Sequence, residues 1–131
     1  MKINRKGYGM SWKFDEKSPI YVQIAQHIKM QIISQEIKNG DQLPTVRELA
    51  EEAGVNPNTM QRAFSELERE GMVYSQRTSG RFVTEDTDLI MQKRREVAEA
   101  ELESFVNNMQ KMGFQINDIT SVLESYIKEK N

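Results

Sequence analysis

The feature that most constrains the fold of this sequence is a pair of short, sharply delimited helices between residues 45 and 71. Thr45-Val-Arg-Glu48 has the pattern of a capping box, in which the threonine hydroxyl and the glutamate carboxylate each accept a backbone hydrogen bond. Ala53-Gly54 ends the first helix, and Asn56-Pro57 begins the second with a cap residue and a proline at the first helical position. Gly71 stops the second helix. This order predicts a helix-turn-helix.

A further helix is predicted before this pair. Ser18-Pro19 again combines a cap residue with proline, and the helix is expected over about residues 19–37, with Gly40 closing it. Apolar residues recur every four positions, as expected for one buried helix face: Ile20, Ile24, Ile28 and Ile32. Residues 1–17 form an extension, in which alternating large apolar residues over 8–14 indicate a short strand.

A two-stranded hairpin is predicted after the pair. The β-favourable runs 72–76 and 81–84 flank Thr78-Ser-Gly80, which indicates a turn with glycine near its tip. The fold class is therefore mostly α with a small β-wing: a winged helix-turn-helix over residues 18–84.

The tail, residues 85–131, has a different pattern. A long charged helix is predicted to reach Met112, Gly113 ends it, and Asn117 is expected to cap a final helix. Apolar residues follow heptad-like steps in the first helix and one stripe in the second, and this spacing favours core or dimer packing over a ligand box. The expected dimerisation residues are Ala98, Leu102, Phe105, Met109, Met112, Ile119 and Leu123.

Composition restricts the function. The chain has no cysteine and one histidine, His27, which argues against disulfides, thiolate chemistry and a histidine-rich metal centre. No nucleophile–base pair or glycine-rich phosphate loop is evident, so we expect no enzyme, no cofactor and no metal. No apolar run approaches the roughly 20 residues of a membrane span, so we expect no membrane partner and a cytoplasmic location.

Charge is distributed unevenly along the chain. The net charge of −2 looks unfavourable for a protein that binds phosphates. Residues 1–18, 19–84 and 85–131 carry five, seven and six Lys/Arg against two, eight and ten Asp/Glu, so the acid is concentrated in the tail. Binding to nucleic acid would then depend on a few well-placed cations and helix-terminal amides.

In a helix-turn-helix the second helix places its first turn in the DNA major groove. The core is expected to take Met60, Ala63, Phe64 and Leu67, with Val55 and Thr59 inward or neighbouring. Asn58, Gln61 and Arg62 then project outward, where amide and guanidinium groups suit adenine and guanine edges. Thr45, Asn56 and the helix-start amides suit phosphates.

Residues 18–84 resemble the GntR family of bacterial transcription factors. The matching segments are Pro19-Ile-Tyr-Val-Gln-Ile24, Gly40-Asp-Gln-Leu-Pro-Thr-Val-Arg-Glu-Leu-Ala50, Val55-Asn-Pro-Asn-Thr59, Glu66-Leu-Glu-Arg-Glu-Gly71 and Gly80-Arg-Phe-Val83. The resemblance implies a homodimer on an inverted-repeat operator of double-stranded DNA, with the wing tip near the minor groove. It implies DNA contacts from Arg47 and from the wing residues Arg77, Ser79 and Gly80, beside Thr59 on the second helix.

The sequence departs from the family pattern in two places. Many relatives have arginine where this chain has Pro57 and Gln61, and Arg62 is a poor replacement because it lies about 100° round the helix from Gln61. The wing has Thr78-Ser79 before Gly80, where another glycine is usual. The operator sequence of relatives therefore does not transfer to this chain.

The tail indicates a branch of the family. Large branches carry a metabolite-binding or enzyme-like domain after the wing, whereas two helices in 47 residues resemble the YtrA-like branch, whose members often regulate transporter operons. Such a tail has little room to enclose an effector, so we expect dimerisation instead. The match to YtrA-like starts begins near Met10, which we expect to be an alternative or true start.

Simpler interpretations stand beside these. Arg47 is also explained as a surface ion-pair partner, and Asn58 and Gln61 as ordinary solvent-exposed helix positions. Lys93-Arg94-Arg95 follows the wing closely enough to touch phosphates but equally suits a solvated face. The main rival function is a winged-helix protein-interaction module without specific DNA binding, which the acidic charge favours; the main hypothesis is a dimeric repressor.

Overall fold

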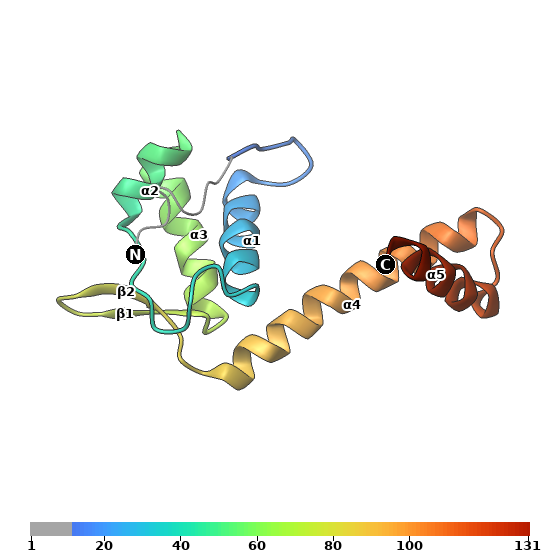
Figure 1. The fold of residues 1–131 in the computed structure, drawn as a ribbon. Coiled ribbons are helices and arrows are strands. Elements are labelled where there is room, and N and C mark those ends of the chain that lie inside the picture. Colours follow the sequence, from blue (N-terminus) through green and yellow to red (C-terminus); the bar gives the residue numbers. More distant parts are fainter. Residues whose placement is uncertain (1–11) are drawn as a thin grey trace. The chain divides into compact units, whose positions relative to one another are not determined.

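The computed structural model describes residues 12–131 (Figure 1). Its elements, in chain order, are α1 (Ile20–Ile33), α2 (Val46–Ala53), α3 (Pro57–Arg69), β1 (Val73–Gln76), β2 (Gly80–Val83), α4 (Thr87–Lys111) and α5 (Ile116–Lys130). The mostly α fold with a small antiparallel wing is confirmed. The chain divides into two compact units with a boundary between Lys93 and Arg94, and each is described by itself.

The first unit is built around α3, which packs against both α1 and α2 (Figure 1). Apolar side chains with 2% exposure or less fill the space between these helices: Ile24, Ile28, Ile32, Leu49, Met60, Ala63, Phe64 and Leu67. The isoleucines of α1 thus form the buried face that their spacing of four predicts, except Ile20, which is 39% exposed at the start of the helix. Hydrophobic burial therefore fixes which face of α3 remains outside.

The N-terminal extension is described only from Trp12 onward. Residues 8–11 of the predicted strand lie outside the described residues, and Trp12 to Phe14 have no regular secondary structure. The Trp12 ring lies against α1 instead, with its centroid 4.9 Å from that of His27. Burial lowers the pKa of His27. The alternating apolar residues in this part of the extension are explained by packing on a helix, without a strand.

The end of α1 differs from the prediction. The helix ends at Ile33, and Gln35 adopts a left-handed φ of +68°. The backbone N–H groups of Glu36 and Ile37 both donate to the carbonyl of Gln31, at 2.9 and 3.0 Å. Ile37 remains only 1% exposed because the turn packs back onto the core. The prediction of a helix to about residue 37 is wrong because the apolar pattern outlasts the helix.

The predicted capping box of α2 is present. The Thr45 hydroxyl accepts a hydrogen bond from the Glu48 N–H at 3.1 Å, and the Glu48 carboxylate accepts one from the Thr45 N–H at 2.9 Å. Gly54 follows α2 with a φ of +71°, which leads the chain into α3. Local chemistry alone therefore sets both ends of α2.

Replacing Thr45 by alanine is expected to lower the free energy of unfolding by about 0.5–2 kcal/mol, since an N-cap hydrogen bond is lost. Urea unfolding followed by circular dichroism measures this change. Thr45→Ser keeps the hydroxyl and is expected to unfold close to wild type. Equal unfolding of wild type and Thr45→Ala would show that the box contributes no stability.

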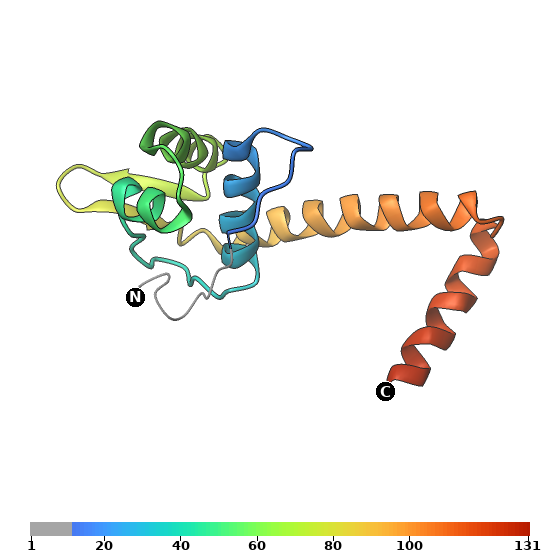
Figure 2. The same cartoon turned by 90° about the horizontal axis from the view of Figure 1, so that it is seen from above.

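The wing is a β1–β2 hairpin that projects from the helices (Figure 2). Val73 pairs with Val83 at its base and Gln76 with Gly80 near its tip. The preceding segment 40–43 runs along the outer edge of β2, with hydrogen bonds of 2.9 to 3.0 Å to backbone groups of Arg81 and Val83. The sheet itself has two strands, and this segment adds an isolated bridge between Gln42 and Phe82.

The first turns of α4 belong to the first unit. Ile90 is 2% exposed, and the Lys93 ammonium lies 3.4 Å from a Glu70 carboxylate oxygen that the Lys29 ammonium approaches to 2.9 Å. Burial of Glu70 raises its pKa, but the hydrogen bonds and charges of Lys29 and Lys93 outweigh this and hold the pKa below its usual value. Glu70 therefore joins α1, the end of α3 and the start of α4.

The second unit contains the rest of α4 and α5. A tight turn joins the two helices (Figure 2). Gly113, between the end of α4 and the start of α5, has a φ of +102°. The predicted cap at Asn117 is wrong, because α5 begins at Ile116 and the Gln115 N–H donates to the Asp118 carboxylate at 3.4 Å. Two described apolar side chains of this unit are buried, Met109 at 8% and Ile119 at 6% exposure.

Candidate nucleic-acid interface

The outward face of α3 is polar at its first turns. Asn58 and Gln61 are exposed, while Met60 and Ala63 are completely buried beneath them. The Gln61 amide makes only a long contact of 3.4 Å to the Ser65 hydroxyl, so it is oriented along the exposed face. Val55 and Thr59, expected to be inward or neighbouring, are half-buried. The structure thus presents two side-chain amides together on one exposed helix surface.

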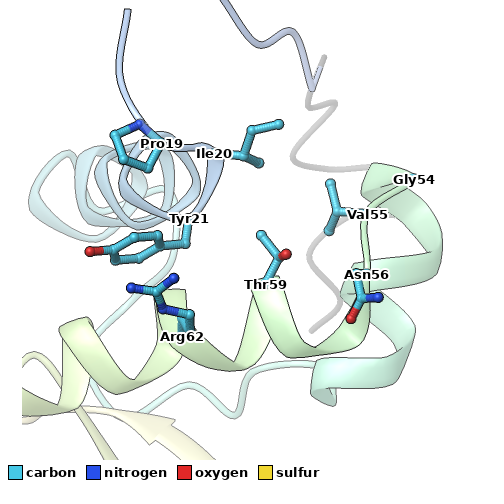
Figure 3. Close-up of a pocket in the computed structure, with 8 residues that line it drawn as sticks. All are labelled: Pro19, Ile20, Tyr21, Gly54, Val55, Asn56, Thr59 and Arg62. Atoms are coloured by element: carbon cyan, nitrogen blue, oxygen red, sulfur yellow. The ribbon is translucent and has the colours of Figure 1, made fainter. Parts of the chain in front are cut away.

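Arg62 has a different environment from these amides. Its guanidinium carbon lies 3.9 Å from the centroid of the Tyr21 ring, a cation–π contact between α3 and the start of α1. The two side chains form one wall of an open groove of about 370 Å³ (Figure 3). The residues that line it are Pro19, Ile20, Tyr21, Gly54, Val55, Asn56, Thr59 and Arg62. Arg62 therefore lies toward α1, apart from the face of Gln61.

The cap residues have part of their hydrogen-bonding capacity occupied. The side-chain oxygen of Asn56 accepts from the Asn58 N–H at 2.7 Å, and the Thr45 backbone N–H donates to Glu48. The Thr45 amide, expected among the phosphate donors, is therefore committed to the capping box. The hydroxyl hydrogen of Thr45 and the side-chain amide of Asn56 remain chemically suited to oxygen acceptors.

Arg47 is the second residue of α2 and is exposed. Within residues 12–131, no carboxylate forms an ion pair with its guanidinium. The interpretation of Arg47 as a surface ion-pair partner thus has no support in the described part of the chain. Its cation stands next to the start of α2, where amide dipoles add positive potential.

The wing tip is formed by exposed residues 77–79, followed by Gly80 with a φ of +109°. The Ser79 N–H donates to the Gln76 carbonyl at 3.2 Å, which closes the turn. Arg77 is the cation of residues 77–79, and both Arg77 and Ser79 are exposed. The turn brings the three predicted wing residues Arg77, Ser79 and Gly80 together.

Arg81, in the same hairpin, makes its contacts with other side chains of the protein. Its Nε lies 3.0 Å from a Glu68 carboxylate oxygen that also accepts from the Ser75 hydroxyl at 2.5 Å. Its guanidinium carbon is 5.2 Å from the centre of the Phe64 ring. Arg81 therefore ties β2 to α3, and its positive charge is paired with the Glu68 carboxylate.

Two contacts of this interface were not anticipated from the sequence. The side chain of Gln42 donates to the Ser79 carbonyl at 2.5 Å, although the residues lie 37 positions apart. Tyr21 stacks on Arg62, whereas its helical position predicts only a broader apolar stripe. Neither pairing leaves a local pattern in the sequence, because each depends on packing between distant segments.

Over residues 12–131, no group of three or more His, Cys, Asp or Glu side chains is arranged to hold a metal ion. Within the same range, no helix is both long and apolar enough to cross a membrane.

A buried three-helix core, an outward-facing capped helix and an adjacent hairpin define a winged helix-turn-helix protein. Residues 20–83 match the family of bacterial regulatory proteins called the gntR family. The HTH-type transcriptional regulator YhcF of Bacillus subtilis (strain 168) is 35% identical over 117 residues, which cover 89% of this chain and 97% of that protein. The chain therefore belongs to the GntR family: it is a transcription regulator with a DNA-binding helix-turn-helix, not an enzyme.

Further relatives agree with this assignment. The HTH-type transcriptional repressor YtrA of Bacillus subtilis (strain 168) is 45% identical over 69 residues, 53% of each chain, which supports the YtrA-like branch. A GntR family transcriptional regulator from Listeria monocytogenes has a TM-score of 0.78 and 38% identity, covering 86% of this chain and 98% of its own. The AraR DNA-binding domain, solved in complex with an operator, has a TM-score of 0.51 and 28% identity, covering 55% and 93%.

Proposed function

We propose that this protein is a dimeric repressor that binds an inverted-repeat operator and occludes a promoter. The observation that carries the proposal is the exposed start of α3. Asn58 and Gln61 lie there on the face opposite the buried core, next to the groove that Arg62 and Tyr21 line. Side-chain amides on a major-groove helix suit bidentate contacts with adenine. Repression is supported by the name of the relative YtrA, an HTH-type transcriptional repressor. The resemblance to the YtrA-like branch favours a transporter operon as the target.

The phosphate contacts are proposed around these amides. Arg47 and the hydroxyl of Thr45 lie at the start of α2, and Asn56 and Thr59 lie at the start of α3. Arg77, Ser79 and Gly80 form the wing tip, which would reach the minor groove. A cytoplasmic location follows from a chromosomal target. These contacts are few, which fits a chain with a net charge of −2.

Dimerisation is proposed through the second unit. Large apolar side chains stand exposed there: Leu102 at 54%, Met112 at 68%, Ile116 at 62%, Leu123 at 37% and Tyr126 at 58%. An apolar face of this kind on a small helical unit marks an interaction surface. The occupant we propose is a second copy of the chain, because a symmetric operator requires two recognition helices in a fixed relation.

The burial of individual side chains reduces the set of seven residues expected in the dimer interface. Met109 and Ile119 are buried within one protomer, so we propose that they stabilise the helical unit itself. Leu102, Met112 and Leu123 are exposed, while Phe105 is half-buried and Ala98 is exposed beside them on the same chain. These five are the proposed contacts between copies.

The deciding experiment is binding to the promoter regions near its own gene, measured across a salt series with a footprint. A specific footprint of two half-sites, with affinity falling steeply with salt, supports the proposal. Equal affinity for random DNA would reject it and favour the protein-interaction module that the acidic charge suggests.

A separate prediction concerns Arg62. Because its guanidinium rests on the Tyr21 ring and faces the groove, we propose that it contacts a phosphate and reads no base. Arg62→Gln is then expected to weaken binding to every operator variant by a similar factor and to reduce the salt slope by about one. Fluorescence anisotropy on single-base operator variants measures both.

The matched comparison is Gln61→Ala, at the neighbouring exposed position. It is expected to relax specificity at one base pair while leaving the salt slope unchanged. If Arg62→Gln instead relaxes specificity at a single position, Arg62 is a base-reading residue and the assignment from its contact with Tyr21 is wrong.

A further inference from the structure

We propose that Gln42 is a positioning residue for DNA binding, which holds the wing tip at Ser79 and Gly80 in its binding conformation before DNA arrives. The inference rests on the proposed function, because it assumes that the wing tip touches the operator. Gln42 itself lies on the segment before α2, outside the recognition helix and outside the hairpin.

The backbone places Gln42 beside the hairpin. The Leu43 N–H donates to the Arg81 carbonyl at 2.9 Å, the Val83 N–H donates to the Asp41 carbonyl at 2.9 Å, and Gln42 forms a bridge opposite Phe82. Gln42 therefore stands at a fixed register along the outer edge of β2. From that register its side chain reaches along the strand toward the tip.

The side chain of Gln42 reaches the tip itself. Its Nε2 donates to the Ser79 carbonyl at 2.5 Å. A Cβ built on Gly80 would stand 2.9 Å from the same nitrogen, closer than real Cβ atoms are found. Glycine is favoured at position 80 by its φ of +109°. A Cβ there would in addition push the terminal amide of Gln42 away from its present position.

The contact between Gln42 and Ser79 is expected to raise the affinity for DNA by ordering the wing tip in advance. A two-stranded hairpin of four-residue strands is marginally stable by itself, so a tip without further contacts would sample several conformations. Binding DNA through such a tip requires that it be ordered, which costs free energy at the moment of association. A tip already held by Gln42 avoids part of that cost, without any contact between Gln42 and DNA.

The test is Gln42→Met, which keeps the length of the side chain and removes the N–H donor without adding charge. The loss of one exposed hydrogen bond is expected to lower operator affinity about three- to tenfold. Nitrogen-15 relaxation of the free protein is expected to show faster motion at Ser79 and Gly80 than in wild type. Unchanged motion at the tip would overturn the proposal.

A double-mutant cycle with Arg77→Ala separates positioning from a general effect on folding. If Gln42 acts through the wing tip, removal of the Arg77 contact makes the Gln42→Met loss smaller than in wild type. Full additivity of the two losses would overturn the proposal. Failure of the proposed function is distinguishable, because wild type would then show no preference for operator over random DNA.

Discussion

Replacing Leu102 and Leu123 together by glutamate is expected to convert the protein to monomers and to lower operator affinity at least about a hundredfold. Both side chains are apolar and exposed, at 54% and 37%, so charge there disfavours packing between copies without opening a core. Two linked half-sites raise the effective concentration of the second recognition helix, and avidity gains of about 10² to 10⁴ are lost with it. Sedimentation and operator titration measure the two effects.

The matched control is Asn107→Glu with Ser121→Glu. These polar positions lie on the same two helices and are also exposed, so the control adds the same charge away from the proposed seam. It is expected to remain dimeric and to lose little affinity. A Leu102→Glu, Leu123→Glu protein that still sediments as a dimer would place the interface elsewhere.

Replacing Arg47 by alanine is expected to weaken operator binding about ten- to a hundredfold, the range of a good charged contact to base or phosphate. Its side chain is exposed at the start of α2 and forms no ion pair with a carboxylate of residues 12–131. The free energy of unfolding is therefore expected to stay close to wild type. Anisotropy titrations and urea unfolding of the same preparation give both values.

Arg69→Ala is the control for lost charge. Arg69 is an exposed arginine of α3 that pairs with Glu66, and this pairing raises the pKa of its guanidinium. Removing it changes the net charge as Arg47→Ala does, so a comparable loss of affinity in both variants would reduce Arg47 to a contributor of general charge. An unchanged affinity in Arg47→Ala would show that its assignment is wrong.

The parts of the fold that local chemistry determines could be predicted from the sequence. Thr45 and Glu48 form their capping box, Gly54 adopts a positive φ between the two helices, and Asn56 caps α3. The end of α1 could not be predicted, because Ile37 continues the apolar spacing after Gln35 has already turned the chain. Apolar spacing predicts which residues are buried, but it does not predict where the helix ends.

For the candidate site, the sequence predicted which helix positions are exposed but not the contacts between distant segments. Helical spacing was sufficient to place Asn58 and Gln61 on an exposed surface. It could not show that Arg62 would stack on Tyr21, 41 positions earlier, since cross-helix contacts depend on how α1 and α3 pack. The pairing of Gln42 with Ser79 is likewise a property of the folded wing.

The sparse internal core of the tail has a consequence for regulation. Within residues 94–131 only Met109 and Ile119 are buried, so in the proposed dimer much of the stability of the second unit comes from the second copy. Helix order in the tail then becomes a function of protein concentration, and its melting temperature rises as the protein is concentrated. For such a dimer, operator occupancy below the dimer dissociation constant would grow with the square of the regulator concentration, so a modest change in its synthesis would switch its target genes sharply.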